Sequence, residues 1–119
     1  MTDSTTTIEE LKRKMLAFAD ERDWGQFHTP KNLTMALAIE AAELMELFIW
    51  VDAQESKETI NTHKEAIEHE IADVASYLFA LCARYNIDLA SAFEKKMELN
   101  ATKYPIEKAK GRYTKYTQL

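Results

Sequence analysis

The stretch from Ala36 to Trp50, ALAIEAAELMELFIW, decides the fold because it combines a buried helix with acidic residues that lack partners. Its apolar residues occupy most of the helical circumference, and such a helix is normally covered on nearly every side. Glu40, Glu43 and Glu46 interrupt this apolar surface, and the stretch contains no Lys or Arg to pair with them. It therefore predicts a packed helix whose acidic residues have a purpose other than ion pairing.

A second pair of acids repeats the same spacing further along the chain. Glu40 and Glu43 are three residues apart, as are Glu70 and Asp73, which places each pair on one face of its helix. The segment around the second pair is again apolar, with no Lys or Arg close by. Unpaired carboxylates in such surroundings cost several kcal/mol each unless they are neutralised. We expect the four carboxylates to bind a cation together, although a solvated acidic face is the simpler alternative.

Carboxylate ligands favour a hard cation, Mg²⁺ or its substitute Mn²⁺. A di-iron site in a helical bundle needs Glu-x-x-His on two helices, and none of the three histidines follows a glutamate at that spacing. Zinc is disfavoured because one cysteine and three scattered histidines form no ligand cluster. Glu46, Glu65 and Glu68 are expected mostly to face solvent.

Composition predicts an all-α protein with a single domain over residues 1–119. The chain has only two glycines and two prolines, and 46% of its residues are hydrophobic, which is enough for a core. Four helices are expected. Thr7 and Glu10 have the spacing of a capping box and start a helix over residues 8–23. Thr29 followed by Pro30 starts the second helix, over 30–51.

The second half of the chain continues this pattern. Residues 52–61 are polar, lack a period and are predicted to form a loop, with a helical turn inside it as the alternative. Thr62 and Glu65 have capping-box spacing and start the third helix, which stops near Asn86. Asp88 caps the fourth, which ends near Lys103, before a Tyr-Pro break. Residues 106–119 form a basic tail without a clear period, and whether it closes over a site stays open.

Charge and cysteine content limit the class of protein. The formal net charge is −5 and the basic residues form no stripe, which argues against a nucleic-acid duplex as partner. The lone Cys82 lies in an apolar run, so we expect a small core residue and a reducing compartment. No segment approaches the ~18 apolar residues of a membrane span, and no targeting signal is seen at the start. A cytoplasmic protein without membrane contact is the expectation.

Aromatic and basic residues near the acids suggest a nucleotide. Trp24 and His28 precede the second helix, Trp50 ends it, and Tyr77 shares a helix face with Glu70. Such rings stack on a base or pack in a core, and a core position is the commoner one for each alone. Lys96, Asn100 and Lys103 form a polar edge of the fourth helix, suited to phosphate oxygens or to solvent. Without a Gly-rich loop, P-loop binding is excluded.

Taken together, these motifs resemble the all-α MazG-like nucleoside triphosphate pyrophosphohydrolases, and most closely their dCTP pyrophosphatase branch. The resemblance rests on the two acid pairs and on the segments RDWGQFHTPKNL, ELFIW, NATKYP and KYTQL. It covers the chain from about residue 8 to residue 119. It implies a MazG-like four-helix bundle that assembles as a homo-oligomer, commonly a homotetramer built from dimers, with sites near subunit interfaces.

The resemblance also assigns roles to individual residues. The acids that it implies as metal ligands and catalytic groups are Glu40, Glu43, Glu70 and Asp73. The residues that it implies for the base and sugar pocket are Trp24, His28, Trp50 and Tyr77. The residues that match the phosphate side are Lys96, Asn100, Lys103 and Tyr104. Met15 stands where some relatives carry a histidine near the base, so the preferred base stays open.

The implied reaction is hydrolysis of a deoxynucleoside triphosphate between the α and β phosphates, giving a monophosphate and pyrophosphate. With dCTP or a modified dCTP as the favoured substrate, this would be a house-cleaning hydrolase, and Glu43 is the candidate general base. Two alternatives stay open. One is a non-enzymatic helical interaction module whose acids receive basic residues from a partner. The other is the same hydrolase acting on dUTP or another noncanonical nucleotide.

Overall fold

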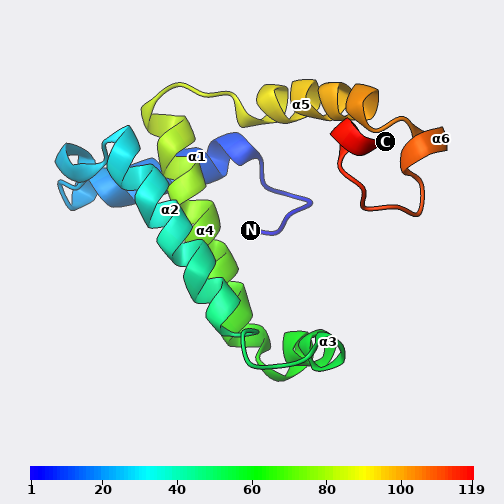
Figure 1. Cartoon of the computed structure of the whole chain (residues 1–119). Helices are drawn as coiled ribbons and strands as arrows, with labels where there is room; N and C mark the ends of the chain where they lie inside the picture. The colour runs from blue at the N-terminus through cyan, green and yellow to red at the C-terminus, as the bar shows by residue number, and fades with distance from the viewer. The chain divides into compact units, whose positions relative to one another are not determined.

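The structure, a computed structural model, describes residues 1–119 and confirms the all-α prediction, with no β-strand (Figure 1). Six α-helices are present rather than the four predicted. They are α1 Ile8–Glu21, α2 Pro30–Glu46, α3 Ala53–Thr62, α4 Lys64–Arg84, α5 Leu89–Lys103 and α6 Ile106–Ala109. Two short 3₁₀ helices are η1 Gly25–Phe27 and η2 Tyr116–Gln118. No helix has the length and apolar character needed to cross a lipid bilayer.

The chain divides into two compact units, Met1–Asn86 and Ile87–Leu119. The first unit contains α1 to α4, and the second contains α5, α6 and η2. Within the first unit, α2 and α4 run antiparallel side by side, and α1 packs on α4 (Figure 1). The helix with two acids from the opening stretch therefore lies against the helix with the second pair.

The core of the first unit is small. Its buried apolar side chains are Ala19, Leu33, Ile67, Ala80 and Cys82. Most of them are small, which lets the helices approach closely, and Leu33 is the one large side chain that is fully enclosed. The burial of Cys82 confirms its predicted place in the core. Most other large apolar side chains are only partly covered within a single chain.

Local capping explains why the helices start where they do. The Thr7 hydroxyl accepts a hydrogen bond from the Glu10 N–H at 3.1 Å, and the Glu10 carboxylate accepts one from the Thr7 N–H at 2.6 Å. Thr29 accepts from the Asn32 N–H at 3.2 Å, with Pro30 as the first helical residue. Asp88 accepts from the Ser91 N–H at 2.8 Å and starts α5. These three predicted starts are confirmed.

The predicted boundaries between residues 47 and 65 are wrong. α2 ends at Glu46 instead of residue 51, since residues 47–50 form turns with three-residue hydrogen-bond spacing, such as Phe48 N–H to the Met45 carbonyl at 3.0 Å. β-branched and aromatic residues follow Phe48, and they favour a helix less than Ala or Leu does. The predicted loop over 52–61 is instead helix α3, because Asp52 accepts from the Glu55 N–H at 2.8 Å and caps it.

The predicted capping box at Thr62 is also wrong. Thr62 is the last residue of α3, and its hydroxyl lies 3.0 Å from His63 Nδ1 rather than on the backbone of α4. α4 starts directly after His63, without a side-chain cap. Its predicted stop near Asn86 lies close to the observed end at Arg84, and Asn86 has a φ of 53°, a left-handed conformation that Asn tolerates. The tail contains α6 and η2, which its sequence did not reveal.

Replacing Leu33 tests the importance of this small core. Leu33→Ala is expected to lower the free energy of unfolding by about 2–5 kcal/mol, because it removes the one large enclosed side chain. Urea denaturation at a fixed protein concentration measures the change. Lys31→Ala, at an exposed position in the same helix, is the matched control and should stay within about 0.5 kcal/mol of the unmodified protein. Equal values for both variants would contradict this account of the core.

Candidate active site

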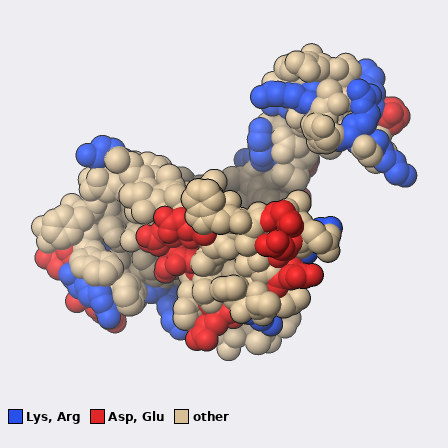
Figure 2. All heavy atoms as spheres, turned by 60° about the horizontal axis from the view of Figure 1, so that its bottom comes forward, with Lys and Arg blue, Asp and Glu red and all other residues tan.

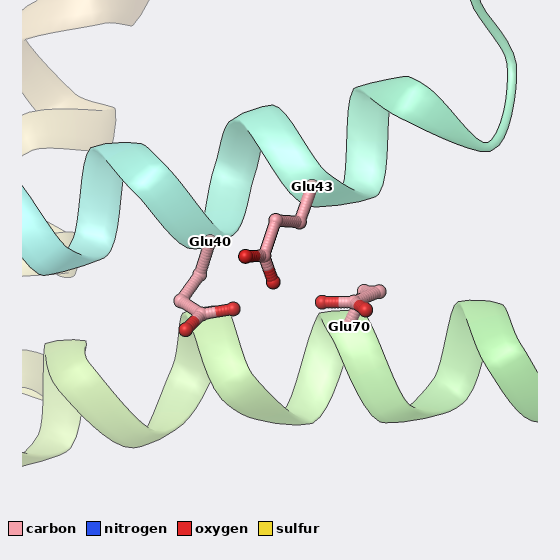
Figure 3. A group of neighbouring side chains, drawn as sticks. All are labelled: Glu40, Glu43 and Glu70. Atoms are coloured by element: carbon pink, nitrogen blue, oxygen red, sulfur yellow. The ribbon is translucent and has the colours of Figure 1, made fainter.

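Three carboxylates meet where α2 and α4 lie side by side. Glu40 and Glu43 project from α2 toward Glu70 on α4, and the three side chains converge in the space between the helices (Figure 3). One carboxylate oxygen from each lies within 4.8 Å of the others. The two helical spacings read from the sequence thus bring three of the four expected acids into one cluster, which we call the carboxylate cluster.

Asp73 lies beside the carboxylate cluster without belonging to its closest group. Its side chain is exposed, and it lines the same cavity as Glu40. Its negative charge also contributes to the raised pKa values of Glu40 and Glu70. The fourth predicted acid is therefore an electrostatic neighbour of the other three.

The cluster is electrostatically unfavourable without a cation. Burial, followed by the nearby Glu43 carboxyl and the charges of Asp73 and Glu70, raises the pKa of Glu40 to about 7. The pKa of Glu70 is raised as well, first by burial and then by Glu43 and Asp73. Neither acid takes part in any ion pair of the chain. Bringing negative charges together in this way destabilises the pair of helices.

The orphaned oxygens show that the residues fit a metal ion. Oε2 of Glu40 and Oε2 of Glu70 are buried and have no hydrogen-bond partner. Buried polar atoms of this kind are rare, and each needs an explanation such as an ion or a water. An all-carboxylate set suits a hard divalent cation, with no soft ligand nearby to favour zinc. The metal itself is not identified by the geometry.

A cavity of about 280 Å³ opens beside these acids. Its apolar wall consists of Met15, Phe18, Trp24 and Tyr77, and Glu40 lies on its acidic side. Burial raises the pKa of the Tyr77 hydroxyl, and the charges of Glu40, Asp73 and Glu43 raise it further, which places the phenol close to the acids. The site therefore joins a flat aromatic surface to a concentration of negative charge.

Of the four residues predicted for the base, two line this cavity, Trp24 and Tyr77. His28 is buried, with 8% of its surface exposed, and its ring centroid lies 6.4 Å from that of Trp24 without lining the cavity. Burial lowers the pKa of His28, and the positive charge of Arg84 lowers it further. Trp50 is 91% exposed in the turn after α2 and does not line the cavity.

The residues predicted for the phosphates lie in the C-terminal unit. Lys96, Asn100 and Lys103 are on α5, and the Tyr104 N–H donates to the Asn100 carbonyl at 2.8 Å where that helix ends. The Lys103 ammonium lies 4.8 Å from the centre of the Tyr116 ring. Figure 2 shows Lys and Arg side chains gathered on this unit, while most acidic side chains in view lie on the first unit.

Phe18 is a cavity residue that the sequence analysis did not identify. It lies on α1 and packs edge-on against Trp24, with ring centroids 5.7 Å apart. Nothing in its sequence context separates a cavity aromatic from a core aromatic. Only the packing of α1 on α4 reveals that its ring borders the site.

The raised pKa values predict that a metal stabilises the protein in a pH-dependent way. The folded-state pKa of Glu40 lies above its ordinary value of 4.5. Protonated Glu40 therefore stabilises the folded state. This stabilisation is complete below about pH 4.5 and is lost as the pH rises through about 7. A divalent cation replaces the proton, so Mg²⁺ should raise the melting temperature more at about pH 8 than at about pH 5.5, where protons compete. Thermal unfolding with and without Mg²⁺ measures this difference.

Two variants sharpen that experiment. Glu40→Gln should reduce both the Mg²⁺ effect and its dependence on pH, because it removes a charge from the cluster. Glu58→Gln, at an exposed position on α3, is the control and should behave like the unmodified protein. The same shift with Mg²⁺ at both pH values in all three proteins would mean that the cluster does not bind the ion.

Comparison with known proteins identifies the family to which the chain belongs. Residues 35–119 match the model of the MazG-like family. The chain is 44% identical to mouse dCTP pyrophosphatase 1 over 115 residues and 42% identical to the human protein, covering 95% of this chain and 68% of either relative. The crystal structure of a pyrophosphatase from Archaeoglobus fulgidus superposes with a TM-score of 0.80 at 40% identity, covering 88% of this chain and 98% of that one. The chain therefore belongs to the MazG-like family.

Proposed function

We propose that the protein is a Mg²⁺-dependent dCTP pyrophosphatase that hydrolyses its substrate between the α and β phosphates to dCMP and pyrophosphate. The observation that carries the proposal is the carboxylate cluster, with its two buried unpartnered oxygens, beside an aromatic cavity. The relatives named dCTP pyrophosphatase 1, 42–44% identical over most of the chain, support this substrate. The enzyme is then a hydrolase acting on phosphoric anhydrides.

The cavity suits a nucleobase next to a polyphosphate. Trp24 and Phe18 meet edge to face in the cavity wall, and Tyr77 lies near the acids. Aromatic faces of this kind stack on any base, so discrimination between bases depends on other contacts. Met15 lines the same wall and offers a soft apolar surface in place of a hydrogen bond. A modified dCTP or dUTP is the alternative substrate within the same reaction.

The carboxylates divide the chemical work among them. Glu40, Glu43, Glu70 and Asp73 would hold the divalent cation, which would neutralise the triphosphate and polarise the α-phosphoryl group. Glu43 is exposed, whereas Glu40 and Glu70 each bury one oxygen. We therefore assign Glu43 the role of accepting the proton of the attacking water, since it is the one exposed acid of the carboxylate cluster.

The C-terminal unit is proposed to handle the phosphates. Lys96, Asn100, Lys103 and Tyr104 supply donors along α5 and its end. The unit carries a series of basic residues suited to a polyanion, namely Lys95, Lys96, Lys103, Lys108, Lys110, Arg112 and Lys115. Lysine ammonium groups bind phosphate oxygens as point charges, so the number of these groups matters more than their exact orientation. In this proposal both units form one catalytic domain.

A homo-oligomer, with a tetramer built from two dimers as the favoured form, is part of the proposal. Large apolar side chains along α2 and the turn after it are exposed in a single chain, among them Met35, Ile39, Met45, Ile49 and Trp50. A surface of this kind is normally covered by a partner. Trp50 is proposed to complete a nucleotide pocket once copies associate. The assembly is expected to work in the cytoplasm.

Product analysis tests the proposed reaction. The purified protein should convert dCTP to dCMP and pyrophosphate with Mg²⁺ and should be inactive with EDTA. Glu70→Gln should reduce turnover by at least about 100-fold, because it removes a cluster ligand. Glu58→Gln is the control on an exposed acid and should keep full activity. Absence of turnover for every deoxynucleoside triphosphate, dUTP included, would make the interaction-module alternative the better reading.

Light scattering tests the proposed assembly. The expected mass is several times the 13.7 kDa of one chain. Ile39→Glu places a charge on the exposed apolar face of α2 and should shift the protein toward smaller species. The control is Lys31→Glu, at the polar start of the same helix, which should keep the size of the unmodified protein. A monomeric unmodified protein at micromolar concentration would contradict the assembly.

A further inference from the structure

The loop between α1 and α2, residues 22–29, carries Trp24 to the cavity, and of its three rings only that of His28 is buried. Trp24 is 40% exposed and Phe27 58% exposed, so neither ring anchors the loop in a core. Asp23 adopts a left-handed conformation with a φ of 55°, which is uncommon for a residue with a side chain. A loop of this kind needs polar contacts to keep a single conformation.

Two neighbouring residues at the end of α4 provide those contacts. Arg84 Nη2 donates to Asp20 Oδ1 at 2.9 Å, which joins α4 to the last turn of α1 just before the loop. The Tyr85 hydroxyl donates to the carbonyl oxygen of His28 at 2.8 Å, just after η1. The loop is therefore tied to the end of α4 at both of its sides.

The Arg84 guanidinium also lies directly against the loop backbone. A Cβ atom added at Gly25 would lie 3.1 Å from Arg84 Nη1 and 3.4 Å from its Cζ, so a side chain larger than hydrogen would press on the guanidinium. The Arg84 side chain is only 23% exposed, and its Nε is buried without a hydrogen-bond partner. Asp20 and the space left by Gly25 therefore fix the position of this group.

The loop backbone connects the fixed position of the Arg84 guanidinium to the cavity. Trp24 donates its N–H to the Ala19 carbonyl at 2.9 Å, and its ring meets Phe18 edge-on at the cavity wall. Neither Arg84 nor Asp20 lines the cavity, so any effect on substrate has to pass through the loop. A shift of the guanidinium would displace η1 and turn the Trp24 ring.

We infer that Arg84 and Tyr85 are positioning residues: together with Asp20 and Gly25 they hold the Trp24 loop at the cavity and so set affinity for the nucleobase without touching the substrate. The inference rests on the proposed function for its link to the base. The link between Arg84 and the conformation of Trp24 stands on the contacts alone. Each part can therefore be tested separately.

Steady-state kinetics with dCTP and Mg²⁺ test the link to the base. Arg84→Gln should raise KM about tenfold, the size expected for losing a charged hydrogen bond that orders the loop, while kcat stays within about threefold. A higher KM with a nearly unchanged kcat indicates weaker substrate binding rather than slower chemistry. Gly25→Ala should change KM in the same direction by a smaller factor. Arg13→Gln, an exposed α1 residue paired only with Glu9, is the control and should match the unmodified protein.

Trp24 fluorescence tests the loop without any turnover. In a Trp50→Phe background, Trp24 is the one remaining tryptophan, and Arg84→Gln should shift its emission to longer wavelength and increase acrylamide quenching. The exchanged pair Asp20→Arg with Arg84→Asp should restore part of the emission in this background and part of the KM in the chain that keeps Trp50, because the ion pair is remade. If dCTP is not a substrate, the proposed function fails and the fluorescence still decides the role of Arg84.

Unchanged Trp24 emission in both Arg84→Gln and Gly25→Ala would overturn the inference. So would a fall in kcat with an unchanged KM, since the loop would then act on chemistry rather than on binding. A loss of helical circular dichroism in Arg84→Gln would point to a general structural role for that residue. Gly25→Ala keeps every hydrogen-bonding group, so its KM and emission then provide the deciding measurement.

Discussion

The repulsion among carboxylates between α2 and α4 is the constraint on which the rest of the structure depends. Glu40, Glu43 and Glu70 come within 4.8 Å of one another on helices whose other residues are mostly apolar. Burial, reinforced by the neighbouring carboxyl groups, raises the pKa of Glu40 to about 7. A helix pair with this arrangement is penalised at neutral pH unless a cation is bound. In the proposed function, folding, metal binding and catalysis would therefore be coupled in the same few side chains.

The rest of the fold keeps this pair of helices together while leaving the site open. Few side chains are fully buried, and α1 packs on α4 so that its Phe18 ring and the Trp24 loop face the acids. The first unit supplies the acids and aromatic surface, and the second carries basic side chains (Figure 2). In the proposed function, the aromatic surface would bind the base of a nucleotide and the basic side chains would bind its phosphates.

The sequence alone predicted the parts of the fold and site that depend on local spacing. The all-α class and the starts of α1, α2 and α5 follow from composition, helical periodicity and capping. The meeting of Glu40, Glu43 and Glu70 was expected because their apolar segments offer no basic partners. Helix α3 was missed because its polar residues carry no clear apolar period, although Asp52 is a cap. The position of Phe18 in the cavity wall and the contacts of Arg84 depend on packing between segments that are far apart in the sequence. Residue spacing within one helix does not predict such packing.

Anomalous X-ray scattering from crystals grown with Mn²⁺ tests the central claim most directly, since it locates the ion without reference to turnover. The account predicts a strong anomalous peak between the carboxylates of Glu40, Glu43 and Glu70, with the otherwise unpartnered oxygens of Glu40 and Glu70 among its ligands. A peak elsewhere, or a Lys or Arg side chain from another copy seated between these acids, would contradict it.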